Sequence, residues 1–170
     1  MLKIGYWLTY TSIIKKGKRK MAQTKPEYER LDEYKELAAK IIDRYPDRFY
    51  GIELDRIQAY MITNKESKED SQKLFEVHAV KMPILLDSKC SHYVVVYSND
   101  WLSMEEAHKL LLIAQTLCAI PLDENGQMVM EKVNTFNMKD FSPMLRTFGT
   151  DYLIRDNVPN LLQEEVAWRD

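Results

Sequence analysis

Apolar residues recur along the chain at two spacings, one typical of helices and one typical of strands. Over residues 26–45 the apolar positions follow the helical period, with Pro26 as the expected first residue of a helix and Pro46 as its stop. Three later segments have the alternation or the β-branched and aromatic composition of strands: 52–63, 72–80 and 92–98. The pattern predicts an α+β domain in which a sheet of about three strands packs on helices.

The longest apolar stretch follows the last of these strands and predicts a buried central helix. We expect this helix to begin at Ser103, because Ser103 and Glu106 have the spacing of a capping box, and to end before Pro121. Apolar residues occupy most sides of the helix, so most of its sides should be buried.

The part of the chain after the central helix predicts a turn and one more helix. Residues 123–126 read Asp-Glu-Asn-Gly, a composition typical of a turn. We expect a C-terminal helix over residues 137–149, with Gly149 as its stop. Pro143 either shortens this helix or moves its start.

Length and composition indicate one ordinary globular domain. The chain has 170 residues, 45% hydrophobic and 29% charged. No segment reaches the roughly 20 apolar residues of a membrane-spanning helix. Two cysteines, Cys90 and Cys118, are too few for a disulfide framework, which favours a reducing cytoplasm. We expect a single domain over residues 21–170, located in the cytoplasm.

Residues 1–20 differ from the rest of the chain in charge. They hold six basic residues and no acidic one, whereas the rest holds 18 basic and 26 acidic residues, a formal charge of −8. An acidic body argues against nucleic-acid binding, which needs clustered Lys and Arg. Residues 1–20 are either a disordered extension before a true start at Met21 or an anchor on a membrane surface. A membrane partner is expected only in the second case.

Six short segments carry a family resemblance through their order and spacing. They are VVVYSNDW (94–101), LSMEE (102–106), LLIAQTLCAI (111–120), DENG (123–126), FNMKDF (136–141) and FG (148–149). Over roughly residues 26–162 the chain resembles the phage metallopeptidase domain family. The resemblance implies a compact zincin-like fold and a phage or prophage origin in a bacterial host. It also implies a zinc helix with two His four residues apart and a Glu beside the first.

The resemblance assigns the zinc and catalytic positions of the family to residues that lack the necessary chemistry. Gln115 and Ala119 stand where the family has its two helix His, and Thr116 stands where it has the Glu. A later His position falls approximately on Phe136. Catalytic zinc needs three N, O or S ligands, and its bound water needs a carboxylate base. Ala119 and Phe136 have no donor atom, and the Thr116 hydroxyl stays protonated near neutral pH.

The leading hypothesis is therefore a metallopeptidase-like pseudoenzyme, with no catalytic residues and no zinc, that acts by binding an unidentified protein. If the alignment is right, Gln115, Ala119 and Phe136 should converge on one point. The former cleft would either be filled by Leu112, Ala119 and Phe136 or hold a peptide without cutting it, and the apolar replacements favour filling. Three strand tyrosines are candidates for a retained protein-binding face: Tyr60, Tyr93 and Tyr97.

The main alternative is an active zinc-dependent peptidase with relocated ligands. Its candidate ligands are Cys90, His92 and His108, of which Cys90 and His92 form a Cys-x-His pair. No third and fourth ligand follow at a diagnostic spacing. A register that places the zinc helix on His108 fails, because Lys109 replaces the Glu and Leu112 replaces the second His. A further alternative, an acidic partner that blocks a nucleic-acid-binding protein, rests only on the charge of −8.

Overall fold

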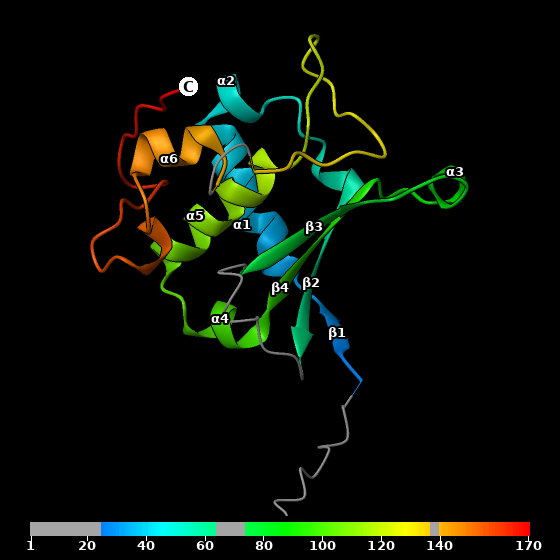
Figure 1. The fold of residues 1–170 in the computed structure, drawn as a ribbon, viewed down its shortest axis with the longest axis horizontal. Helices are drawn as coiled ribbons and strands as arrows, with labels where there is room; N and C mark the ends of the chain where they lie inside the picture. Colours follow the sequence, from blue (N-terminus) through cyan, green and yellow to red (C-terminus); the bar gives the residue numbers. More distant parts are fainter. Residues whose placement is uncertain (1–24, 64–73, 137–139) are drawn as a thin grey trace, which may run out of the picture.

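The computed structural model describes residues 25–63, 74–136 and 140–170, and it places a four-stranded sheet beside two long helices (Figure 1). The strands are β1 (Glu27–Arg30), β2 (Ile57–Thr63), β3 (Phe75–Ala79) and β4 (His92–Tyr97). Their order in the sheet is β1-β2-β4-β3. The central strands β2 and β4 run parallel, and β1 and β3 pair antiparallel at the two edges. This architecture confirms the predicted α+β class.

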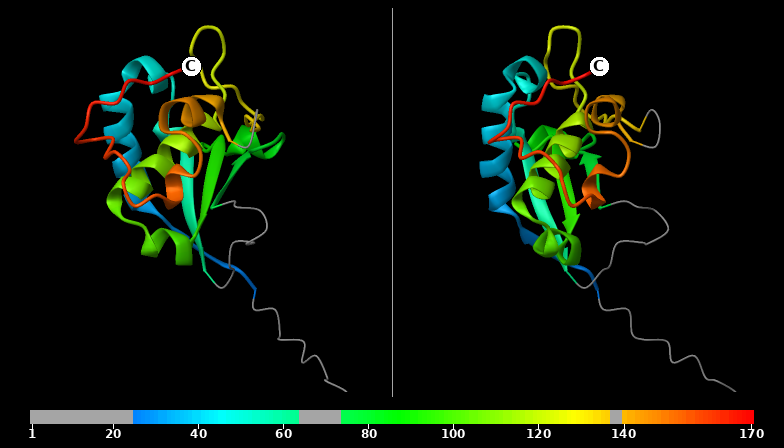
Figure 2. Two further views of the ribbon diagram at one scale, coloured as in Figure 1. Left: turned by 60° about the vertical axis from the view of Figure 1, so that its left-hand side comes forward. Right: turned by 90° about the vertical axis from the view of Figure 1, so that its left-hand side faces the viewer.

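The two long helices cover one face of the sheet. Side chains of a strand alternate between faces, so Ile57, Ala59 and Val94 share the inner face, where all three are buried. Helices α1 (Asp32–Arg44) and α5 (Glu106–Cys118) lie on this side (Figure 2). Eight consecutive residues of α5, from Leu110 to Leu117, are buried, as the continuous apolar pattern predicted.

Shorter helices close the ends of the two-layer core: α2 (Pro46–Phe49), α4 (Ser98–Ser103) and α6 (Ser142–Phe148), with the 3-10 turns η1 (Leu54–Arg56) and η3 (Tyr152–Ile154). Pro46 cannot continue α1 but suits the first position of α2. Helix α4 turns the chain from β4 into α5 and buries Trp101. Gly149 ends α6 with a φ of 80°, in the left-handed region that favours glycine.

The connection from β3 to β4 projects from the body, and we call residues 80–91 the arm. The short helix α3 (Ile84–Asp87) lies at its far end (Figure 1). The side chains of Met82, Ile84 and Leu86 are 54%, 67% and 72% exposed. The apolar run in the arm is therefore not part of the core.

Most of the predicted elements are confirmed. The strands expected within 52–63, 72–80 and 92–98 correspond to β2, β3 and β4. Pro143 lies in the first turn of α6, so the described part of the C-terminal helix starts at Ser142. The remaining predictions for residues 1–20, 64–70 and 137–139 fall outside the described residues. None of the helices in the described parts of the chain has the length and apolarity that crossing a bilayer requires.

Two predicted helix starts are wrong. Residues 27–30 form β1 rather than a helical turn, because their backbone pairs with β2, with Glu27 opposite Thr63. The sheet therefore has four strands rather than about three. The central helix does not begin at Ser103: this residue ends α4, and its hydroxyl donates to the carbonyl of Asp100 at 2.9 Å. Helix α5 begins at Glu106 without a side-chain cap.

Candidate functional site

The positions that the resemblance assigns to zinc chemistry lie in the interior of the molecule. Gln115, Thr116 and Ala119 are on or directly after α5 and are 5%, 0% and 3% exposed. Helix α1 packs along one side of α5, and β3 approaches another. Two surface cavities of the molecule are lined by other residues. A peptide bound at the surface therefore has no direct access to these three side chains.

Thr116, at the position of the family's Glu, is tied into the core by two hydrogen bonds. Its hydroxyl donates to the carbonyl of Ile113 at 2.7 Å and lies 2.6 Å from the hydroxyl of Tyr34, which therefore donates to Thr116. Burial raises the pKa of Tyr34 well above its ordinary value, so Tyr34 stays a donor. The pair links α1 to α5 and leaves no proton acceptor of the kind a general base needs.

Among these positions, only Gln115 has a possible metal-ligating atom that is free of a hydrogen bond from the described residues. Its Oε1 is buried and has no hydrogen-bond partner among the described residues. Ala119 has no side-chain donor, and the Thr116 oxygen is committed to Tyr34 and Ile113. The α5 positions thus offer zinc a single neutral oxygen, whereas a catalytic site needs three ligands. The residues present do not fit the metal that the resemblance implies.

Phe136 lies in the segment that follows α5. Asn134, two residues earlier, donates its backbone N–H to the carbonyl of Ala119 at 2.7 Å, so this segment runs beside the end of α5. The Phe136 ring contacts the rings of Phe75 and Phe141 at centroid distances of 6.5 and 4.9 Å, and it is 40% exposed. Phe136 is therefore only partly a filling residue. The convergence of Gln115, Ala119 and Phe136 stays a prediction.

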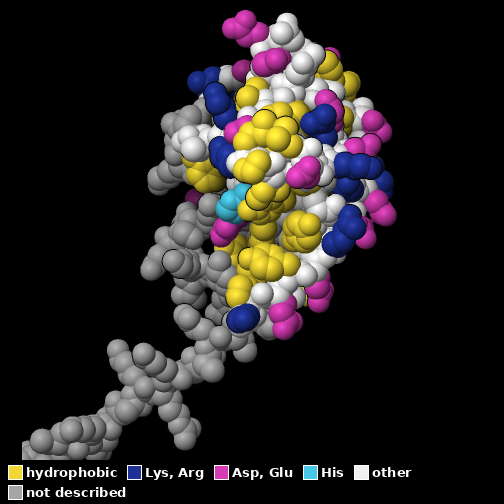
Figure 3. All heavy atoms as spheres, turned by 90° about the vertical axis from the view of Figure 1, so that its right-hand side faces the viewer, with side chains coloured by type: hydrophobic (Ala, Val, Ile, Leu, Met, Phe, Trp, Pro, Cys, Tyr) yellow, Lys and Arg dark blue, Asp and Glu magenta, His cyan; other side chains and the backbone are white. Residues whose placement is uncertain are grey.

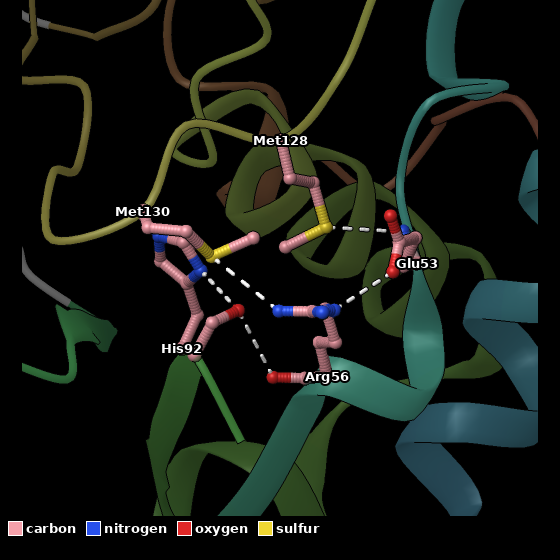
Figure 4. Close-up of polar contacts among 6 residues, drawn as sticks. Glu53, Arg56, His92, Met128 and Met130 are labelled. Atoms are coloured by element: carbon pink, nitrogen blue, oxygen red, sulfur yellow. Dashed lines mark hydrogen bonds and ion pairs between the residues drawn. The ribbon is translucent and has the colours of Figure 1, made fainter. Parts of the chain in front are cut away.

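The three alternative zinc ligands use their donor atoms for hydrogen bonds to the chain. His92 lies at the start of β4 (Figure 4). Its Nε2 donates to the carbonyl of Lys132 at 2.8 Å, and its Nδ1 lies 3.0 Å from the Ser91 hydroxyl. Burial lowers the pKa of His92, so its imidazole is neutral at pH 7. The Cys90 thiol donates to the carbonyl of His92 at 2.8 Å, and burial raises its pKa.

His108 belongs to a different part of the molecule from Cys90 and His92. It lies in the first turn of α5, beyond the opposite end of β4, and its Nε2 donates to the carbonyl of Arg155 at 2.8 Å. Within the described ranges, no three His, Cys, Asp or Glu side chains are grouped so that they could hold a metal ion. The relocated ligand set is therefore not assembled by the described residues.

Comparison with known families shows which family this chain belongs to. The family model described as "Putative phage metallopeptidase" matches residues 26–165, which is most of the chain. The chain belongs to this phage metallopeptidase family. The match confirms the resemblance that the sequence segments indicated over residues 26–162. No curated protein and no solved structure matches the chain.

Sequence reasoning missed two polar clusters in this family member, of which the first is buried. Asp140 is 8% exposed and accepts hydrogen bonds from the backbone N–H of Phe141 and the hydroxyl of Tyr152, both at 2.6 Å. Burial and the adjacent carboxylate raise the pKa of Tyr152 above its ordinary value, so Tyr152 remains a donor. This pair ties the start of α6 to η3. Asp140 was visible in the Lys-Asp-Phe segment, but no local pattern pointed to Tyr152.

The second cluster lies at the start of β2 and β4 (Figure 4). Arg56 forms an ion pair with Glu53 at 2.8 Å, and its guanidinium points to the sulfur of Met130 at 3.8 Å. The sulfur of Met128 accepts from the backbone N–H of Glu53 at 3.0 Å. Together with the bond from His92 to Lys132, these contacts hold residues 128–132 against the end of the sheet.

The face of the sheet opposite α1 and α5 is also apolar, and we call it the open face. A small second core of Ile62, Val95 and Tyr97 lies there, with Tyr93 packed against it. Tyr28 of β1, opposite Ile62, is 57% exposed on the same face. Figure 3 views this side of the molecule and shows apolar side chains gathered in a band with charged side chains at its borders.

A hydrogen-bonded network fixes part of the open face. Glu76 accepts from the Tyr97 hydroxyl at 2.7 Å and lies 3.0 Å from Nε2 of His78. The His78 ring stacks on Tyr93 with a centroid distance of 4.8 Å. Burial, together with Glu76, raises the pKa of Tyr97 to about 12, so its hydroxyl stays a donor. The aromatic rings on this face are thus held in defined orientations.

Proposed function

We propose that this chain is a catalytically inactive member of the phage metallopeptidase family and that it acts by binding a protein. The observation that carries the proposal is Thr116. A working member needs a carboxylate at this position, and this chain has a fully buried hydroxyl hydrogen-bonded to Tyr34. A side chain committed to the core in this way supports a structural role for the former catalytic helix.

We also propose that the chain holds no catalytic zinc. Support comes from the donor set, since Gln115 offers one neutral oxygen and Ala119 offers none. The bacterial cytoplasm is the compartment we propose for the protein, because Cys90 and Cys118 are both free thiols. In this view the ancestral helix α5 has become part of the core.

The open face is the surface we assign to the protein partner. Sheets with one solvated face usually carry polar side chains there, whereas this face of β2 and β4 carries the partly exposed Tyr60 and Tyr93 and the buried Ile62 and Val95. Tyrosine is enriched at the centres of protein interfaces, where it provides large contact area with little loss of conformational entropy. The network of Glu76, described above, reduces that loss further.

Charge favours a protein over a nucleic acid or a membrane as the partner. Glu76 and, opposite Tyr60, Arg30 lie on the open face, whereas Glu27 and Glu29 of β1 point to the other face of the sheet. Arg30 donates to Gln58 at 2.7 Å. A nucleic acid or an anionic lipid surface would require an excess of Lys and Arg, which these residues do not supply.

Metal analysis of the purified full chain tests the inactive assignment. After expression with added zinc, we expect well under one zinc ion per chain and no hydrolysis of casein or of a quenched fluorescent peptide library. Zinc near one per chain together with hydrolysis abolished by a chelator would overturn the proposal. The relocated-ligand alternative would then be tested with Cys90→Ser, His92→Gln and His108→Gln.

Photocrosslinking tests the binding assignment independently. A benzoylphenylalanine placed at Tyr28, on the open face, should form an adduct with one discrete protein in cells that carry the phage. The matched control places the same group at Lys40, an exposed position on α1. Equal adducts at both positions, or adducts only with RNA or lipid from Tyr28, would contradict the proposed partner class.

A further inference from the structure

A surface cavity of about 630 Å³ lies at the C-terminal end of α5, where its lining includes the sequence neighbours of the buried Thr116 and Ala119 but neither of these residues. It is bounded by α2, by residues 134–135 and by the start of α6. Seven of the twelve lining residues that the structure describes are apolar, and the others are polar or charged; the apolar ones are Phe49, Ile52, Leu117, Ile120, Leu122, Phe141 and Pro143. The volume is typical of a pocket for a small organic molecule.

Arg48 is the one Lys or Arg among the described residues that line this cavity. Arg48 of α2 lines the wall, and its side chain is 20% exposed. Burial raises the pKa of Cys118, also in the wall, to about 11, so this group remains a neutral thiol. Asp47 balances the charge of Arg48 within the lining. The pocket is therefore suited to one carboxylate rather than to a dianion such as phosphate.

The chain already places a carboxylate on Arg48. The side chain of Asp170 forms an ion pair with Arg48, while Arg146 donates to the backbone carbonyl of Asp170. The Asp170 side chain is 87% exposed. An ion pair so open to water contributes little free energy, and a ligand displaces it at small cost.

The segment that carries Asp170 is anchored by one aromatic side chain. Trp168 packs edge-on against Tyr45, Phe49 and Phe148, with centroid distances of 5.7, 5.7 and 5.3 Å. Its Nε1 is buried with no partner among the described residues. The red end of the ribbon runs past α6 toward α2 in Figures 1 and 2. Residues 168–170 thus combine an apolar ring with a carboxylate beside the cavity.

We propose that this cavity binds an organic carboxylate with an apolar body, anchored by Arg48, and that Asp170 occupies the anchor when no ligand is bound. The carboxylate accepts from the guanidinium, and the apolar body fills the space between α2 and α6. The source of the ligand is a free small acid or the carboxyl end of a peptide. The inference does not rest on the proposed function, because the cavity and the open face share no residue.

Titration of the full chain with matched acid and amide probes tests the proposal. The probes are 3-phenylpropionate, acetyl-Gly-Gly-Phe with a free carboxylate, and the amide of each. We expect saturable binding of an acid by NMR chemical shifts, and at least about tenfold weaker binding of its amide, since a hydrogen bond to a charged group is lost. The acid that binds more tightly identifies the source.

Three variants locate the site. Arg48→Gln should weaken binding of the acid by about tenfold or more. Asp170→Asn should tighten it by about two- to fivefold, because a weak internal competitor is removed. Arg30→Gln, on β1 far from the cavity, is the matched control and should leave binding unchanged. Equal binding of acid and amide to the wild-type chain, or no saturable binding at millimolar concentrations, would overturn the proposal even if Arg48→Gln does not fold.

Discussion

The polar groups on the two sides of the sheet have different roles. On the inner side, hydroxyl, imidazole and carboxylate groups are buried and paired with one another or with the backbone, as in Thr116 with Tyr34. On the open face, Glu76 accepts from the buried Tyr97 and contacts His78, whose ring stacks on the partly exposed Tyr93. The buried pairs on the inner side stabilise the fold, whereas the hydrogen bonds on the open face orient the side chains of the surface that we assign to a partner. Under the proposed function, the difference teaches that the family's catalytic positions and the binding surface need not share a side of the molecule.

The largest expected effect comes from restoring the family's carboxylate on the inner side. Thr116→Glu buries a charge beside Tyr34 where no cation balances it, so the free energy of unfolding should fall by more than about 3 kcal/mol. Chemical denaturation measures the change. Thr116→Val is the matched control: it keeps the shape, leaves the Tyr34 hydroxyl unpaired, and should cost about 1–2 kcal/mol. A Thr116→Glu variant as stable as wild type would mean that this position opens to solvent.

A smaller effect is expected from pH at His92. Burial lowers its pKa below 6.5, so the unfolded chain binds a proton at higher pH than the folded chain. The stabilisation that neutral His92 provides is therefore complete above about pH 6.5 and is lost as the pH falls toward the folded pKa. The stability of wild type relative to His92→Gln should be larger at pH 8 than at pH 5.5, changing by at most about 1.4 kcal/mol per pH unit. The same difference at both pH values would contradict a buried neutral imidazole.

The smallest effect on stability is expected on the exposed side. Tyr28→Ser and the arm variant Ile84→Ser/Leu86→Ser remove side chains that are more than half exposed, so the free energy of unfolding should change by no more than about 0.5 kcal/mol. Thermal denaturation measures this. Tyr28→Ser should nevertheless reduce crosslinking from a neighbouring position such as Tyr60. A large loss of stability would show that the open face serves the fold rather than a partner.

The sequence predicted elements whose patterns are local. Residues 92–98 and the run before Pro121 gave β4 and the core of α5, because β-branched and continuous apolar segments leave few alternatives. Strand β1 was missed because its pairing with β2 depends on residues 30 to 36 positions away. The apolar residues of the arm resemble core residues in sequence, and their exposure follows only from the position of α3.

The candidate site was predictable to a similar extent. The alignment assigned Gln115, Thr116 and Ala119 to the former zinc positions on one helix, and their burial in α5 agrees with its apolar pattern. Tyr34, the partner of Thr116, was not predictable, because it lies 82 positions earlier on α1. The cavity at Arg48 was missed for the same reason, since its walls come from four separate parts of the chain.

The parallel pairing of β2 with β4 also constrains the order in which the chain assembles. Ile57 pairs with His92, so the centre of the sheet closes only after β4 has been made, whereas β1, α1 and β2 are available much earlier. Contacts between distant residues slow folding, because a long loop must be ordered before they form. During synthesis, the first 90 residues can therefore pair β2 with β1, but the edge of β2 that pairs with β4 stays without its partner. The fold is completed by the segment from β4 through α5, which also contains the positions that align with the zinc helix of the family.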